Sequence, residues 1–268
     1  MRRSWQIVGG VMLAVALLVA GGAAQSASKS SSSVSTSGGP AEVRLGGFAF
    51  ETGAQLAFEI VHEGTVDCFQ SKVTVESLRL VGPDGALLHE EKCVPAAPAE
   101  SWIGRVRLVD SGGAPLAMAT YKVVIATNVG SFVAEVDVAT ASDLYRLGRY
   151  SATASVCGYT LRVYRLLTGL DDGAALTLRV GDRLMIELEG NATTGYAWAN
   201  TLEVEYPVLR EMQEAEYRAA TGLMGAPGVF LFRYDVVDAG PQMLRFAYQR
   251  PWESVEPIQV VLFTLNVS

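Results

Sequence analysis

The C-terminal part of this chain alternates apolar and polar residues with a period of two, and this pattern limits its fold more than any other feature. In residues 183–189, Leu184, Ile186 and Leu188 fall on one face and charged residues on the other. Residues 230–236, 244–248 and 261–267 repeat the pattern. Because successive side chains of a strand point to opposite faces, each run predicts a strand with one buried face and one wet face.

The N-terminal half also predicts short strands, which are joined by turn sequences. Residues 121–126 and 132–136 flank a turn and are typical of a β-hairpin. No long segment has helical periodicity, so we expect an all-β protein. It would hold two immunoglobulin-like β-sandwich domains, at residues 41–140, of unknown role, and at residues 154–268. The first resembles the immunoglobulin-like modules of exported bacterial proteins, and this likeness carries little functional weight.

The first 25 residues are typical of a signal peptide. Arg2 and Arg3 precede an apolar run over residues 7–20, and small residues follow at a cleavage position. An uncleaved segment would instead tether the protein to a membrane surface. Residues 26–40 are rich in Ser and Gly and predict a flexible linker. We therefore expect a secreted, periplasmic or cell-surface protein.

Composition excludes several function classes. The formal net charge is −7, and the extreme N-terminus is the only place where basic residues cluster, which argues against nucleic-acid binding. Hydrophobic residues make up 50% of the 268 residues, enough to fill a core. The two histidines lie far from Cys157 in sequence, and the sequence holds no C-x-x-C pair, so we expect no metal site and no cofactor.

The chain has three cysteines, and export favours disulfide formation. Cys68 and Cys93 share the N-terminal half, so we expect a disulfide between them. Cys157 is then left over, either buried and inert or available as a reactive thiol.

Three short segments between the predicted C-terminal strands are the candidate functional loops. The first is Asn-Ala-Thr-Thr-Gly-Tyr-Ala-Trp at residues 191–198, and the second is Met-Gly-Ala-Pro-Gly at residues 224–228. The third begins with Arg-Pro-Trp at residues 250–252. Taken singly, each segment also has a purely structural interpretation. The first two would be an ordinary turn and an ordinary loop. In the third, Trp252 would pack on the sandwich rim and Arg250 would pair with Glu253.

Taken together, in this order and spacing, the three segments resemble the chagasin-type inhibitors of papain-like cysteine peptidases. The first matches the family signature Asn-Pro-Thr-Thr-Gly-Tyr/Phe-x-Trp at all but one defined position. Ala192 replaces the proline, which removes a fixed φ and predicts a less preorganised loop. The residues of the implied peptidase-binding site are Asn191, Ala192, Thr193, Thr194, Gly195, Tyr196, Trp198, Met224, Gly225, Ala226, Pro227, Gly228, Arg250, Pro251 and Trp252.

The resemblance implies reversible, tight-binding inhibition in which three loops at one end of a β-sandwich occlude the peptidase cleft. The first loop would lie over the catalytic cysteine of the peptidase, with the other two on either side. No enzymatic activity and no small-molecule substrate are implied.

Two other function classes stay open. An adhesion or ligand-binding β-sandwich module without inhibitory activity would explain the additional N-terminal domain. An enzyme would need an acid/base pair, for which the available residues are Asp171, Asp172, Glu214 and Glu216.

Overall fold

The computed structural model describes residues 41–44, 55–63, 73–92, 101–108, 116–138, 147–152, 157–202, 207–219 and 227–268. Across these ranges the chain forms β-strands and two short 3-10 turns, which confirms the predicted all-β class. The predicted signal peptide and linker lie outside the described residues. Within the described ranges, no helix has the length and apolar character needed to span a membrane.

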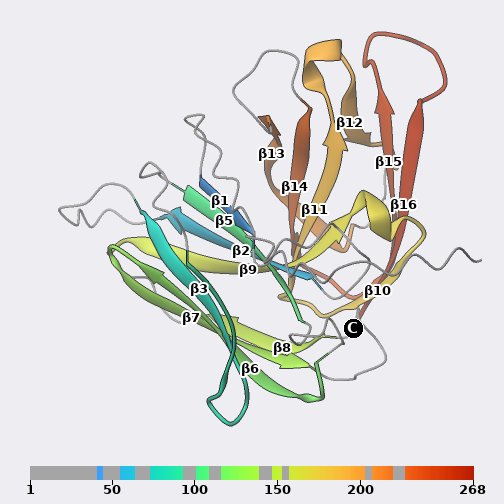
Figure 1. Ribbon diagram of the computed structural model, residues 1–268. Helices are drawn as coiled ribbons and strands as arrows, with labels where there is room; N and C mark the ends of the chain where they lie inside the picture. The colour runs from blue at the N-terminus through green and yellow to red at the C-terminus, as the bar shows by residue number, and fades with distance from the viewer. Residues whose placement is uncertain are drawn as a thin grey trace, which may run out of the picture. The chain divides into compact units, whose positions relative to one another are not determined.

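The largest sheet has seven strands and runs through both halves of the chain, in the order β1-β5-β2-β9-β11-β14-β13 (Figure 1). Its strands are β1 (Ala41–Arg44), β5 (Ser101–Arg107), β2 (Gln55–His62), β9 (Tyr159–Thr168), β11 (Arg183–Gly190), β14 (Gly228–Val236) and β13 (Leu209–Ala219). β9 is the junction, because it pairs antiparallel with β2 and parallel with β11.

Two smaller sheets complete the described fold. The five-stranded sheet is ordered β4 (Leu87–Lys92), β3 (Val75–Val81), β6 (Ala119–Thr127), β7 (Gly130–Val138) and β8 (Leu147–Ala152). The four-stranded sheet is ordered β10 (Ala175–Leu178), β16 (Gln259–Val267), β15 (Gly240–Gln249) and β12 (Ala197–Asn200). The 3-10 turns are η1 (Gly169–Asp171) and η2 (Ala192–Thr194). The predicted hairpin is confirmed as β6–β7.

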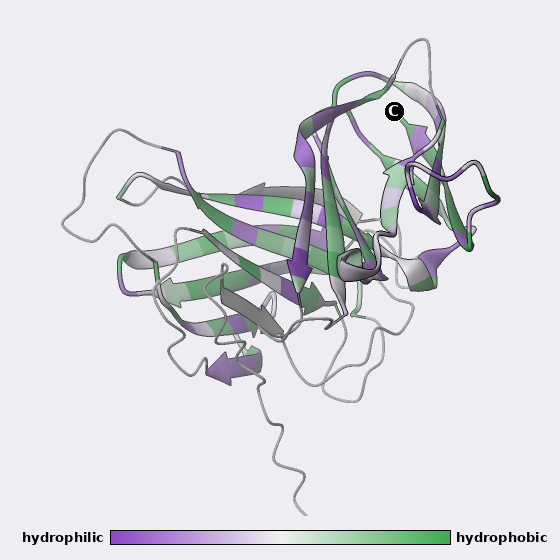
Figure 2. Ribbon diagram, turned by 90° about the horizontal axis from the view of Figure 1, so that it is seen from above, coloured by the Kyte–Doolittle hydropathy of each residue, from purple (hydrophilic) through white to green (hydrophobic). Residues whose placement is uncertain are grey.

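Two apolar cores lie between these sheets, as the period-two pattern predicts, and the strands alternate in hydropathy along their length (Figure 2). The N-terminal core includes Phe58, Trp102 and Phe132, whereas the C-terminal core includes Phe246 and Phe263. β9 supplies both, with Leu161 in the first core and Leu167 in the second. The predicted β-sandwich architecture is confirmed, and one strand belongs to both sandwiches.

The opposite face of β11 and β14 was predicted to be wet, and this is wrong, because Glu187 and Arg233 on that face are buried beside Met185 and Leu231. Arg233 on β14 has no exposed surface, and its Nη2 lies 2.8 Å from Glu216 Oε2 on β13 and 3.1 Å from Glu59 Oε1 on β2. Tyr164 on β9 donates a hydrogen bond of 2.7 Å to Glu59 Oε2. Because removing one partner of a buried ion pair leaves an uncompensated charge, this arrangement ties β2, β9, β13 and β14 to one another.

A second buried ion pair crosses the same sheet. Arg105 on β5 and Glu187 on β11 are both almost fully buried, and the Arg105 Nε donates to Glu187 Oε2 at 2.6 Å. The Arg233–Glu59 and Arg105–Glu187 pairs each join a residue before position 140 to one after position 154. The predicted division into domains at this boundary stays a proposal, and the residues on its two sides share hydrogen bonds, a sheet and ion pairs.

The predicted disulfide is wrong in its pairing. Cys157, expected to be left over, is disulfide-bonded. The sequence has only two other cysteines, Cys68 and Cys93, and both lie outside the described residues. A bond from Cys157 to either one excludes the predicted bond between them. The error came from pairing cysteines by proximity in sequence, whereas the sheet brings the start of β9 beside β2.

We expect a fragment of residues 154–268 to be much less stable than the full chain. The fragment lacks β2, so Tyr159, Leu161 and Val163 lose their core, at roughly 1.5–3 kcal/mol for each exposed side chain. Arg233 also loses Glu59. Urea unfolding of both proteins measures the difference. A fragment with the same midpoint and slope as the full chain would show that the second sandwich folds independently.

Stability should also depend on pH through Glu216. Burial opposes its ionisation, but hydrogen bonds from Arg218 and Arg233 outweigh burial and hold its pKa below the ordinary value of 4.5. A lowered pKa stabilises the fold above pH 4.5, and this contribution disappears as the pH falls through the folded-state pKa. Glu216→Gln should therefore lower the free energy of unfolding at pH 7 by about 1–3 kcal/mol, with a smaller difference in acid.

The matched control is Glu135→Gln, which removes an exposed ion pair with Lys122. This change should lower the free energy of unfolding by no more than about 1 kcal/mol. A Glu216→Gln effect that is independent of pH would contradict the ionic role of Glu216.

Candidate functional site

The strand register brings the ends of all three predicted loops together. Gly190 precedes the first loop and pairs with Gly228, which follows the second loop, in the β11–β14 ladder. Ala197, near the end of the first loop, pairs with Gln249, the residue before the third loop, in the β12–β15 ladder. The three loops therefore leave the sandwich at one end, and the first lies between the other two.

The first loop is a 3-10 turn fixed by its own side chains. The Asn191 Oδ1 accepts hydrogen bonds from the Thr193 N–H at 3.1 Å and from the Thr193 hydroxyl at 2.6 Å. The Thr194 hydroxyl donates to the Asn191 carbonyl at 2.6 Å. Gly195 ends the turn with a φ of 81°, a left-handed conformation that favours glycine. The Asn-x-Thr-Thr-Gly sequence thus supplies every group that closes the turn.

Tyr248 holds this turn onto the sandwich. Its hydroxyl accepts a hydrogen bond from the Asn191 N–H at 2.7 Å and donates one to the Asn191 carbonyl at 3.3 Å. Its ring stacks on Trp198 at a centroid distance of 5.1 Å. A Cβ on Gly190 would lie 3.1 Å from the Tyr248 ring, so glycine is needed there for the ring to approach. The sequence pattern identified Tyr248 as a core residue and gave no signal for its hydroxyl.

The third loop contacts the first through two side chains. The Arg250 guanidinium lies over the Tyr196 ring, 4.7 Å from its centroid, and donates to Glu253 at 2.8 Å. That hydrogen bond raises the pKa of Arg250. A Cβ on Gly195 would lie 2.7 Å from the Trp252 ring, which therefore rests on this glycine. Both loops form one continuous surface.

Trp252 is the most exposed large hydrophobic residue of the described chain, with 69% of its surface open. The alternative interpretation, in which Trp252 packs on the sandwich rim, is therefore wrong. The Arg250–Glu253 ion pair that belonged to this alternative is present. Val255 and Ile258 in the same loop are also exposed, and the sequence analysis missed both. Exposed apolar side chains on an ordered loop are a feature of binding surfaces.

Only the end of the second loop is described. Pro227 is exposed, and Gly228 is buried as the first residue of β14. Gly228 allows a close approach, because a Cβ there would meet the Arg218 carbonyl oxygen at 2.2 Å. The predicted site residues Met224, Gly225 and Ala226 lie outside the described residues.

The described residues show where the acids considered for an enzyme lie: Asp171 and Asp172 at η1, and Glu214 and Glu216 on β13. They contain no group of three or more His, Cys, Asp and Glu that could hold a metal ion. Asp171 is committed to a capping box with Thr168, and Glu216 to Arg218 and Arg233. The acidic residues considered for an enzyme therefore have structural partners or lie on separate elements.

This end of the sandwich thus carries two loops that contact each other and an exposed Trp252. A profile described as "Chagasin family peptidase inhibitor I42" matches residues 177–267. Chagasin from Trypanosoma cruzi is 33% identical over 89 residues, which cover 32% of this chain and 81% of chagasin. The chain belongs to the chagasin family of peptidase inhibitors, and members of this family are inhibitors rather than enzymes.

Two further comparisons concern Entamoeba histolytica proteins. Amoebiasin-2 is 28% identical over 120 residues, which cover 42% of this chain and 94% of amoebiasin-2. The crystal structure of the cysteine protease inhibitor EhICP2 matches with 28% identity and a TM-score of 0.34. That match covers 38% of this chain and 94% of EhICP2.

We expect Tyr248→Phe to loosen the first loop while leaving the fold intact. The change removes one hydroxyl and leaves the Asn191 N–H without its acceptor, at about 1 kcal/mol of unfolding free energy. Amide hydrogen exchange at Asn191 should become several-fold faster. Tyr121→Phe is the control, since the Tyr121 hydroxyl donates to the Ala117 carbonyl at 2.9 Å in the N-terminal sandwich. Unchanged exchange at Asn191 in the Tyr248 variant would contradict the anchoring role.

Proposed function

We propose that this protein is an exported, reversible, tight-binding inhibitor of papain-family cysteine peptidases. One observation carries the proposal, namely that the register places the three loops at one end of the sandwich with the first loop between the others. Such an arrangement forms a wedge that can enter a cleft. Family membership supports the inhibitory activity, while the target class rests on the match of the loop residues to the chagasin signature.

The first loop would act by occupying the cleft, with no covalent step. The hydroxyls of Thr193 and Thr194 already donate to Asn191. The described parts of the loops, residues 191–198, 227–228 and 250–258, contain no Cys or His that could form or assist a covalent bond. The closed turn is ordered before binding, which reduces the entropy lost on association. The hydrogen bonds of Asn191 and Tyr248 compensate for the missing proline at Ala192.

The third loop would supply the main apolar contact. Trp252 is highly exposed, yet its ring is positioned by Gly195. Trp and Arg are enriched among residues that dominate binding energy. Pro251 restricts the backbone between Arg250 and Trp252. Met224, Gly225 and Ala226 are included among the proposed binding residues on the basis of the sequence match alone.

Export is part of the proposal and rests on residues 1–25. The basic start and the apolar run that follows are typical of a signal peptide. An exported inhibitor would meet peptidases outside the cytoplasm, or at the cell surface if the segment stays attached.

The direct test is titration of papain and of a cathepsin L-type peptidase with the full-length mature chain. The full chain is used because β9 is shared between both sandwiches. We expect stoichiometric inhibition that is reversed on dilution. Fully active peptidases in the presence of folded protein would reject the proposal and favour the adhesion or ligand-binding module.

Trp252→Ala tests the loop surface itself. We expect inhibition to weaken by about 2–4 kcal/mol in binding free energy, which is typical of a lost hot-spot aromatic. The matched control is Arg183→Ala, at the opposite end of β11, where Arg183 pairs with Asp235. Inhibition constants for the wild type and both variants give the comparison. Equal effects of the two substitutions would contradict a binding surface made by the loops.

A further inference from the structure

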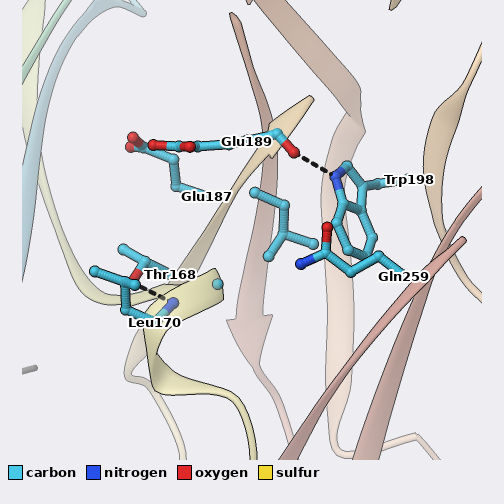
Figure 3. A pocket seen from close by; sticks show the side chains of 8 residues that line it. Thr168, Leu170, Glu187, Glu189, Trp198 and Gln259 are labelled. Carbon is cyan, nitrogen blue, oxygen red and sulfur yellow. Dashed lines mark hydrogen bonds between the residues drawn. The ribbon is translucent and has the colours of Figure 1, made fainter. Parts of the chain in front are cut away.

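A cavity of about 360 Å³ lies on the flank of the C-terminal sandwich, beside the loop-bearing end (Figure 3). It borders the C-terminal core, to which its lining residues Leu188 and Trp198 belong. The lining residues are Thr168, Gly169, Leu170, Glu187, Leu188, Glu189, Trp198 and Gln259. Figure 3 shows Trp198 and Gln259 on the opposite side of the view from Thr168 and Leu170.

The cavity forms where two neighbouring strands separate. β9 pairs with β11 only as far as Thr168 and Glu187, and the chain then turns away into η1. A capping box between Thr168 and Asp171 fixes that turn. Beyond Glu187, no strand of the described residues pairs with β11 on the β9 side. The open space beside the end of β11 therefore results from the path of the backbone.

The far wall is the base of the first loop. Trp198 is 4% exposed, and its indole Nε1–H donates to the Glu189 carbonyl at 2.8 Å (Figure 3). Gln259 is the first residue of β16 and follows the third loop directly. A protein bound by the first and third loops would thus lie next to this cavity.

The charge of the cavity is negative. Glu187 and Glu189 project from the same side of β11, and none of the eight lining residues in the described chain is Lys or Arg. Glu187 is 2% exposed, and only its Oε2 is bonded, to Arg105. Its Oε1 is buried and has no hydrogen-bond partner within the described residues. A buried carboxylate oxygen without a donor is unfavourable, and a bound donor would satisfy it.

We propose that this cavity binds the basic side chain, Lys or Arg, of the protein held by the loops. The apolar walls of Leu170, Leu188 and Trp198 suit the methylene stem of such a side chain. The exposed carboxylate of Glu189 suits its charged head, and a rotation of Glu187 that opens its buried Oε1 would let one guanidinium donate to both acids. The proposal of a binding site depends only on the cavity. The proposal that a peptidase side chain occupies this site depends on the proposed function.

The first experiment tests the site without a peptidase. The full-length mature chain is titrated with N-acetyl-L-arginine amide, and the indole N–H resonance of Trp198 is followed by NMR after its assignment with Trp198→Phe. A ligand of this size should bind with a Kd of roughly 1–10 mM. The uncharged analogue N-acetyl-L-citrulline amide should bind at least several-fold more weakly.

Glu189→Gln should weaken arginine amide binding several-fold, because it removes one of the two carboxylates while leaving the Arg105–Glu187 pair in place. The matched control is Glu214→Gln, an exposed acid on β13, which should bind the amide like the wild type. Equal binding of the arginine and citrulline amides, or no movement of the Trp198 resonance up to ~50 mM, would overturn the site.

The second experiment tests the occupant. The chain is saturated with papain and then titrated with N-acetyl-L-arginine amide. Loss of amide binding, together with several-fold weaker inhibition by Glu189→Gln but not by Glu214→Gln, would support a peptidase side chain in the cavity. An amide that binds the complex as well as the free chain would overturn that assignment. Because the first experiment contains no peptidase, failure of the inhibitor function would be seen separately from failure of the site.

Discussion

The rest of the structure depends on the double pairing of β9. Its first half pairs with β2 and faces the N-terminal core, and its second half pairs with β11 and faces the C-terminal core. Buried ion pairs through Arg233 and Arg105 cross the same sheet. At Arg165 the strand pairs with both neighbours, so the two sandwiches meet within one continuous sheet. The loops are therefore carried on a scaffold that includes the N-terminal sandwich.

Hydrogen bonds and ring contacts made by aromatic side chains order the loop surface. Tyr248 joins the backbone of Asn191 to the core, and its ring stacks on Trp198. Arg250 over Tyr196 then links the first loop to the third. These contacts fix the loops before any partner arrives, so that little conformational entropy remains to be lost on binding. They explain how a chain with Ala192 in place of proline retains an ordered first loop.

The sequence predicted the parts of this structure that depend on local pattern. Alternation in residues 183–189 identified the face of β11 that Leu184, Ile186 and Leu188 bury, and the loop motifs identified one end of the sandwich. Pairing between strands that are distant in sequence leaves no such local pattern. The contact of β2 with β9 and the burial of Arg233 depend on strands that are distant in sequence, and no local pattern indicated that Cys157 is disulfide-bonded. The hydrogen bond of the Tyr248 hydroxyl was not predicted either, because alternation indicates only which face of a strand is buried.

The pairing of β2 with β9 also sets an order for folding. β2 emerges early during synthesis, but β9, one of its two partner strands, lies on the far side of the predicted domain boundary, together with Tyr159, Leu161 and Val163 of the N-terminal core. Pairing between strands that are distant in sequence is slow, and strand edges that stay unpaired in the meantime are prone to aggregation. The N-terminal sandwich therefore stays incomplete until β9 has emerged.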